Sequence, residues 1–503
     1  MKTSKSTTVI LVAMMMVTAS FNACMNQAAD PMSPGIYDYY AADGDVNGGE
    51  YLKPEQQSGD NFEEFTDNPF IDVATEPKST FSVDADGTAY AYMRRMVTSG
   101  NHLNKQSVRI EEFLNYFTFD YPDPTDGNEV AINGELGECP WNKEHKLLRL
   151  GLKGKSLSES EMPKSNYVFM VDVSGSMYGA DRLDLLKKGL LELVDHMNPD
   201  DRVSIVTYSG AVSLALESTL IKDKDQIKRV INSLDASGST AGAKALEMAY
   251  AEAEKNFIEG GNNRIIMGTD GDFNVGVSST EGLLEIVKSH ADKGIYMTVC
   301  GFGIGNFNDG IMERVSNAGN GTYVYVDCEE EMLKVFNYER SHLISVCADT
   351  KVQITFNPKK VKQYRLIGYE NRVMANEDFE DDTKDAGEIG AGQTITALYE
   401  LVPADDWDTE ASAGTFDVRY KKKLGDSSVA LTLDIDKWSA DQSENLNFAA
   451  GVAAYGMVLR ESEYKGDATL KMASELVAKN RTFDPQGYRG QLLQLIDKAT
   501  NLK

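Results

Sequence analysis

The chain has 503 residues, 42% of them hydrophobic, which is enough for about three domains with cores of their own. This composition excludes a wholly disordered protein. The formal net charge of -28 at pH 7 argues against a nucleic-acid partner, because no basic surplus exists to release counterions from a polyphosphate.

Residues 1–24 have the pattern of an export signal. Two early lysines precede an apolar run at residues 9–17, which is too short to span a bilayer. The segment ends Phe21-Asn22-Ala23-Cys24 and resembles the lipobox of bacterial lipoproteins, although Phe21 and Asn22 depart from the usual Leu-Ala or Leu-Ser pair. The resemblance implies that Cys24 is lipidated and anchors the protein in the bacterial cell envelope, at the outer membrane. Secretion with Cys24 removed is the alternative.

Residues 25–76 are polar and acidic with few periodic apolar positions, which predicts a disordered tether between membrane and folded body. Within it, the segment Asp43 to Gly48 copies the first half of an EF-hand loop. The twelfth position is Pro54, which cannot supply the bidentate carboxylate, so we do not predict a calcium site there.

Residues 77–160 are predicted to form two short helices followed by strands at 129–136 and 146–152. The second helix carries an apolar stripe at i, i+3, i+4 and i+7, made by Ile110, Phe113, Leu114 and Phe117. The cluster Asp84-Ala85-Asp86-Gly87 precedes the first helix. Helix capping is the favoured role for this cluster, and cation binding is the alternative.

Residues 164–346 alternate apolar strands with amphipathic helices, for example the helix at 182–197. This pattern is typical of a parallel sheet covered on both faces and predicts a doubly wound, mostly parallel α/β domain. Ligands of such domains bind at the carboxyl ends of the strands. The predicted strands are 167–171, 203–208, 264–268, 295–302 and 322–326.

Residues 347–440 contain alternating segments with acidic turns between them, which predicts a flanking β-sandwich-type domain. Because strands are also expected before residue 164, the α/β domain is hypothesised to be inserted in one sandwich built from both flanks. Residues 441–503 are predicted to be terminal helices, notably 445–461 and 490–499. The strands expected in the sandwich are 351–356, 364–369, 394–401, 414–420 and 429–435.

Three side chains that suit a divalent cation follow the first strand of the α/β domain, namely Asp172, Ser174 and Ser176. A carboxylate and two hydroxyls on one loop are ligands for Mg²⁺ or Mn²⁺, whereas the alternative is a flexible strand-to-helix turn. A Gly/Ser loop that leads into a helix offers Thr240 as a further hydroxyl. A later buried strand ends at Asp270, which offers a second carboxylate.

The order of these loops resembles the metal-ion-dependent adhesion site (MIDAS) of von Willebrand factor type A (VWA) domains. The resemblance implies that the metal ligands are Asp172, Ser174, Ser176, Thr240 and Asp270, some of them through water. Asp272 and Asn274 lie beside the site and are candidates for supporting the ligands, with a capped turn as the alternative. The metal implied is Mg²⁺, or Mn²⁺ or Ca²⁺.

A wider resemblance covers nearly the whole chain beyond the tether. FSVDADGTAY, VRIEEFLNYF, YRLIGYENR and FAAGVAAYGMVLRESEYKG are similar to blocks of bacterial lipoproteins that carry a VWA domain between a characteristic N-terminal segment and a C-terminal domain of unknown function. This resemblance implies a fold and a metal site. It supplies neither a substrate nor a partner.

We expect a protein-binding, adhesion-type module whose metal accepts an Asp or Glu carboxylate from a partner protein. The alternative is an envelope-complex scaffold in which the metal is purely structural. A metal-dependent hydrolase is less favoured, because the chain has no G-x-S-x-G elbow and no histidine in a strand-end loop of the α/β domain. Gly301 to Gly305 lacks the third glycine of a dinucleotide fingerprint and predicts only a tight turn.

The cysteines after Cys24 lack the C-x-x-C spacing of zinc sites and leave any disulfide pairing open. Cys300 lies in a strand-like run, where a buried free thiol behaves as a small hydrophobe. The others are Cys139, Cys328 and Cys347.

Overall fold

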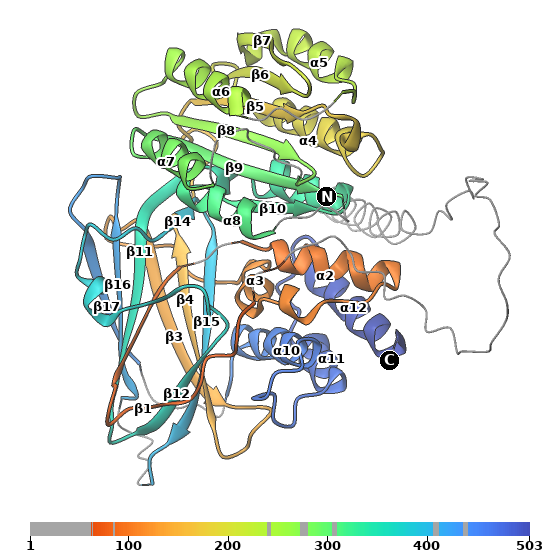
Figure 1. Cartoon of the computed structure of the whole chain (residues 1–503). Coiled ribbons are helices and arrows are strands. Elements are labelled where there is room, and N and C mark those ends of the chain that lie inside the picture. The colour runs from red at the N-terminus through yellow and green to blue at the C-terminus, as the bar shows by residue number, and fades with distance from the viewer. Residues whose placement is uncertain are drawn as a thin grey trace, which may run out of the picture.

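The computed structural model describes residues 62, 64–83, 86–238, 243–271, 280–303, 309–405, 412–435 and 441–502. Three layers are visible in Figure 1: an α/β unit at the top, a two-sheet sandwich at the lower left and a group of helices at the lower right. Among the described residues, no helix combines the length and the apolar character needed to cross a membrane.

The α/β unit is built on one six-stranded sheet in the order β10-β9-β8-β5-β6-β7, in which only β7 is antiparallel. This confirms the predicted doubly wound α/β class. The sequence interpretation missed β7, an edge strand in which only Leu216 is buried. The strands are β5 (Ser165–Asp172), β6 (Arg202–Tyr208), β7 (Val212–Leu220), β8 (Asn262–Thr269), β9 (Ile295–Phe302) and β10 (Tyr323–Val326).

Helices cover both faces of this sheet, and each face has its own apolar core. On one face, Leu186, Leu190 and Leu193 of α4 form the predicted stripe and are buried. Along the chain, β6 is added on one side of β5 and β8 on the other, so the strand order reverses between β5 and β8. Ligands of doubly wound sheets bind at this point. The helices are α4 (Leu183–His196), α5 (Lys224–Ser233), α6 (Ala243–Lys255), α7 (Thr280–Ala291), α8 (Asp309–Ala318) and α9 (Glu329–Leu333).

The sandwich takes strands from both sides of the α/β unit. One sheet has the order β1-β12-β15-β4-β3, and the other has the order β13-β2-β11-β16-β17 with β14 paired to β11. The α/β unit is therefore inserted in one sandwich, as the hypothesis required, and the β-rich segment 347–440 is not self-contained. The early strands are β1 (Ile71–Asp72), β2 (Lys78–Ser82), β3 (Val130–Glu138) and β4 (Lys146–Gly154). The later ones are β11 (Ser345–Phe356), β12 (Val361–Ile367), β13 (Val373–Met374), β14 (Gly387–Gly390), β15 (Thr394–Pro403), β16 (Gly414–Lys421) and β17 (Val429–Ile435).

The helical layer also joins the two ends of the chain around one shared core. Ile110 and Phe113 of α3 are buried against α10, where Gly456 lets the helices approach, since a Cβ there would lie 2.9 Å from Ile110 Cγ1. Phe117 of the predicted stripe is buried but follows the end of α3. The helices are α2 (Thr88–Ser99), α3 (Ile110–Asn115), α10 (Glu444–Leu459), α11 (Leu470–Lys479) and α12 (Tyr488–Leu502), of which α11 lies in the predicted helical segment but was not located individually.

The predicted tether does not extend to Glu76. Asn68 Nδ2 donates hydrogen bonds to the backbone oxygens of Leu366 at 3.2 Å and Gly368 at 2.8 Å, and Val73 is buried in the sandwich. Strand β1 pairs with β12. These contacts are made with residues almost 300 positions away, so local composition gave no sign of them.

The capping role predicted for the Asp84 to Gly87 cluster is wrong for the part that the structure describes. Asp86 Oδ1 accepts a hydrogen bond from Tyr323 N in β10, at 3.2 Å. In the first turn of α2, Ala89 N instead donates to Glu112 Oε2 at 2.6 Å. Asp86 therefore ties the start of α2 to the α/β sheet, while a carboxylate from α3 satisfies the helix N-terminus.

The four cysteines in the described part of the chain are free and buried. Cys300 has the predicted character of a small hydrophobe, and burial raises the pKa of its thiol to about 12. Burial likewise raises the pKa of Cys347 to about 12.

Candidate metal centre

The loop after β5 brings the first three predicted ligands together. Asp172, the last residue of β5, is fully buried, and its Oδ1 accepts a hydrogen bond from Ser174 N at 2.8 Å. Ser174 Oγ and Ser176 Oγ lie 3.0 Å apart. One carboxylate and two hydroxyls therefore converge at the carboxyl end of a central strand, where the fold places ligands.

The fourth described candidate follows the neighbouring strand. β8 pairs in parallel with β5, and Asp270 comes directly after it. Thr269 links the two strand ends, because its Oγ1 donates to Asp172 Oδ2 at 3.4 Å and accepts from Gly271 N at 3.3 Å. Asp270 is 4% exposed, and its buried Oδ1 has no hydrogen-bond partner among the residues that the structure describes.

Two buried carboxylates at one strand edge are electrostatically unfavourable. Burial raises the pKa of Asp172 to about 6, the charge of Asp270 adds to this, and hydrogen bonds from Ser174 and Thr269 oppose it. In the part of the chain that the structure describes, no Lys, Arg or His forms an ion pair with either carboxylate. A divalent cation would satisfy the free Asp270 oxygen and both charges, so the residues present fit the predicted metal.

A second loop, at residues 237 and 238, hydrogen-bonds to the loop after β5 and comes shortly before the predicted ligand Thr240 in the sequence. Gly175 N donates to Gly238 O at 3.0 Å, and Ser237 N donates to Val173 O at 2.7 Å. Gly238 has a φ of +88°, which glycine adopts without strain. The backbone around the two serines is thus fixed before any ligand binds.

The remaining predicted site residues lie outside the described residues. These are Thr240, Asp272, Asn274 and Cys24. Their roles as metal ligand, supporting residues and lipidation site stay predictions.

The sequence interpretation missed a brace that comes from outside the α/β unit. Arg95 of α2 forms an ion pair with Asp181 at 2.7 Å, five residues after Ser176. Next to Asp181, Arg182 Nη1 donates to Ser176 O at 3.1 Å. Arg182 lies against Gly303, where a Cβ would collide with its Nε. A sign was present in the sequence as Arg94-Arg95 within a largely apolar helix, but nothing local identifies the partners.

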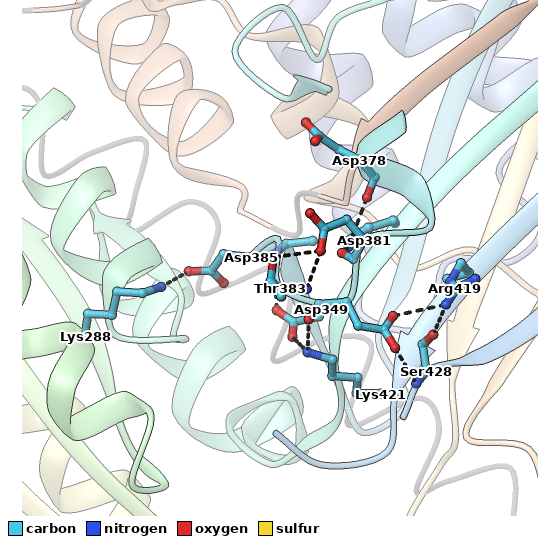
Figure 2. A network of polar contacts seen from close by, with 12 residues as sticks. Lys288, Asp349, Asp378, Asp381, Thr383, Asp385, Arg419, Lys421 and Ser428 are labelled. Atoms are coloured by element: carbon cyan, nitrogen blue, oxygen red, sulfur yellow. Dashed lines mark hydrogen bonds and ion pairs between the residues drawn. The ribbon is translucent and has the colours of Figure 1, made fainter. Parts of the chain in front are cut away.

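The acid-rich segment at 376–386 is not a second metal site. Figure 2 shows that lysines already occupy this network: Lys421 Nζ pairs with Asp349 at 2.6 Å and donates to Asp382 O at 2.7 Å. Lys351 Nζ donates to Asp378 O at 3.2 Å. Across the described residues, no group of three or more His, Cys, Asp and Glu side chains is arranged to hold a metal. The candidate centre is not such a group, because only two of its four described ligands are carboxylates and the other two are hydroxyls.

Three family models match successive parts of the chain. A model described as "von Willebrand factor" matches residues 56–149. The "von Willebrand factor type A domain" model matches residues 167–272, which include β5, β8 and the four described candidate ligands. A model described as "Uncharacterized protein YfbK, C-terminal" matches residues 341–502.

The chain is 39% identical over 464 residues to "Uncharacterized protein YfbK" of Escherichia coli K12, an alignment that covers 87% of this chain and 80% of that protein. It is 28% identical over 181 residues to the human inter-alpha-trypsin inhibitor heavy chain H3, covering 34% of this chain and 20% of that protein. The structure of a von Willebrand factor type A protein from Catenulispora acidiphila aligns with a TM-score of 0.43 and 14% identity, over 73% of this chain and 89% of that one.

Proposed function

We propose that this chain, which belongs to the family of YfbK, binds a partner protein through a divalent cation. Proteins of this bacterial family combine a von Willebrand factor type A domain with a YfbK C-terminal domain. VWA domains commonly bind a divalent metal at a MIDAS and generally mediate protein–protein interactions. The proposal places the cation at the ends of β5 and β8 and gives its open coordination position to an Asp or Glu side chain of the partner.

The observation that carries this proposal is the buried Oδ1 of Asp270, which has no partner within the described part of the chain and lies beside the buried Asp172. Together with Ser174 and Ser176, these side chains would hold Mg²⁺, or Mn²⁺ or Ca²⁺, and Thr240 is the predicted fifth ligand. When bound, the cation supplies an electrophile for an oxygen ligand. Neutral hydroxyls donate less charge to it than carboxylates would, which favours a further carboxylate from outside.

An exposed aromatic side chain next to the site supports recognition over a purely structural metal. Tyr178 is 77% exposed and lies two residues after Ser176. Its backbone N donates to Gly175 O at 3.2 Å, within the loop that Arg182 and Gly238 hold in place. Rigidly presented tyrosines are enriched among residues that dominate binding energy at protein interfaces. A partner carboxylate on the metal would bring the neighbouring residues of the partner onto Tyr178.

The proposed location is the bacterial envelope, with a lipid on Cys24 anchoring the protein to the outer membrane. The export-signal pattern and the polar residues that follow it support this location. A tethered recognition module gains from such an anchor because the partner then meets it at high local concentration.

A hydrolytic function has less support. Among the described residues, no histidine hydrogen-bonds to Ser174 or Ser176, the hydroxyls nearest to the proposed cation. His145 pairs with Glu400 in the sandwich, and His290 stacks on Tyr250 at a centroid distance of 3.9 Å. Without a base in contact, neither serine is activated as a nucleophile.

Crosslinking capture on intact envelopes tests the function. We expect the partner to be captured by the unaltered protein in Mg²⁺ and lost both in EDTA and with Asp172→Ala, because each change removes the bridging cation. Asp184→Ala is the matched control, since it removes an exposed carboxylate from the first turn of α4 and should leave capture unchanged. Capture that survives both EDTA and Asp172→Ala would show that the metal is not the bridge.

A further inference from the structure

We propose that a cavity between the α/β unit and the sandwich binds a small α-amino acid, whose carboxylate pairs with Arg264 and whose ammonium group pairs with Glu388. This site is separate from the proposed metal centre and has a ligand of its own. The inference depends on one observation: a cationic and an acidic side chain line the same cavity, and neither has an ion-pair partner among the described residues.

The cavity lies where the two units meet. The α/β unit contributes Arg264 of β8 and the loop before β10, and the sandwich contributes Ser345 at the start of β11 and Glu388 of β14. In Figure 1, β14 lies at the end of the sandwich that faces the α/β sheet. Arg264 is near the start of β8, whereas Asp270 follows the end of that strand, about 20 Å further along it. The cavity is therefore at the opposite end of the sheet from the metal centre.

Arg264 is a buried cation without a counter-ion in the described part of the chain. It is 1% exposed, its Nη1 donates to Thr298 Oγ1 at 2.9 Å, and its guanidinium lies over the ring of Tyr296, 5.4 Å from the centroid. Its Nε is buried and has no acceptor among the described residues. A hydroxyl and a ring do not neutralise the charge, and burial lowers the pKa of Arg264. A carboxylate is the group that matches a guanidinium with a spare donor.

Glu388 is the complementary group on the sandwich side. Its Oε1 is buried and accepts no hydrogen bond within the described residues, and no Lys, Arg or His there forms an ion pair with it. Burial raises the pKa of Glu388 well above its usual value, and the charges of Asp385 and Asp349 add to this. The charge of Arg264 opposes the shift without overcoming it. An ammonium group beside Glu388 would stabilise its ionised form.

The other titratable side chains of the cavity wall are paired or neutral. Asp86 Oδ1 accepts from a backbone amide of β10, and Arg372 Nη2 lies 3.3 Å from Glu313 Oε1. Burial lowers the pKa of His342, so its ring is uncharged at pH 7. An anion alone would leave the acidic group unmatched, and a cation alone would leave the guanidinium unmatched. A zwitterion satisfies both.

The size of the cavity selects the smallest members of this ligand class. It offers about 30 Å³ to the centres of water-sized groups, whereas a single water needs roughly 10–15 Å³. This room suits a molecule of a few heavy atoms, such as glycine or alanine. Because its two charged ends would contact different units, the bound amino acid would join the α/β unit to the sandwich.

Calorimetric titration of glycine into the dialysed full chain tests the proposal. We expect one glycine per chain with a dissociation constant below about 1 mM. Acetate and methylammonium each carry only one of the two charges, so each should bind at least about tenfold more weakly. Glycine binding should be the same in EDTA, because no metal takes part. Acetate that binds as tightly as glycine would overturn the zwitterion, and absence of glycine binding would overturn the site.

Two variants, one in each unit, locate the binding. Arg264→Gln and Glu388→Gln should each weaken glycine binding at least about tenfold, since each removes one charged contact. The matched controls are Arg229→Gln and Glu475→Gln, which remove exposed charges from α5 and α11 and should leave binding unchanged. Circular dichroism and Mg²⁺ binding check the fold of each variant. Unchanged glycine binding by both folded site variants would overturn the amino-acid site and leave the metal centre standing.

Discussion

Asp270→Asn is expected to stabilise the metal-free protein while abolishing its response to Mg²⁺. Among the described residues the buried Asp270 Oδ1 has no hydrogen-bond partner, and the charge of Asp270 acts on Asp172. The neutral amide removes the repulsion between the two carboxylates. We expect the free energy of unfolding in EDTA to rise by about 1–3 kcal/mol. Saturating Mg²⁺ at a hundred times its dissociation constant should stabilise the unaltered protein by about 2.7 kcal/mol and leave the variant unchanged.

Urea unfolding of both proteins, in EDTA and in Mg²⁺, measures these effects. Asp184→Asn is the matched control, because it neutralises an exposed carboxylate on α4 and should behave like the unaltered protein in both conditions. A variant that is less stable in EDTA and still gains stability from Mg²⁺ would mean that Asp270 is a structural residue and not a ligand.

The second large effect is expected at the junction between α2 and the α/β unit. Arg94 is buried, and its guanidinium donates to Asp327 Oδ2 at 2.8 Å and to Glu331 Oε2 at 2.7 Å. Tyr116 Oη accepts from Arg94 and donates to the same Glu331 oxygen, which closes the network. Arg94→Ala leaves two buried carboxylates without a cation, and we expect it to cost about 3–5 kcal/mol of stability.

The midpoint of urea unfolding, followed by tyrosine fluorescence, measures this loss. Lys188→Ala provides the comparison, since Lys188 and Glu329 form a 2.8 Å ion pair with side chains 52% and 53% exposed. An exposed pair contributes only about 0–1 kcal/mol. If Arg94→Ala cost no more than Lys188→Ala, the junction would not depend on the buried charges.

Local patterns in the sequence were enough to predict the α/β unit. The runs 167–171 and 264–268 were predicted as strands from their mainly apolar residues, which are buried in β5 and β8, and the α4 stripe faces one core. β7 was not predicted because it lies at the sheet edge, where only Leu216 is buried and the strand lacks a continuous apolar run. Within the predicted helical segment 441–503, the short helix α11, which packs on α10, was not located individually.

Contacts between distant segments explain what local patterns could not predict. β4 pairs with β15 across the whole α/β unit, and Asn68 is fixed by backbone oxygens near residue 367. Asp86 binds β10 instead of capping α2, since Glu112 from α3 already satisfies that helix end. In each case the contacting residue is too distant in the sequence for composition or periodicity to indicate it.

The candidate site also combines features that the sequence predicted with features that it did not. The loop from Asp172 to Ser176 and Asp270 were found because both come at the ends of buried strands, and the structure places them at adjacent strand ends. The brace from Arg95 to Asp181 was not found, because α2 precedes the α/β unit in sequence and belongs to another layer. The candidate ligands could thus be proposed from the sequence, whereas the ion pair that holds their loop in place could not.

Calorimetric titration of Mg²⁺ into the full chain tests the central claim most directly, with Asp172→Ala as the variant and circular dichroism as the check on its fold. The metal site at the ends of β5 and β8 predicts one ion per chain for the unaltered protein and no measurable binding to a folded Asp172→Ala variant. Equal binding by the two proteins, or no binding by either, would contradict it.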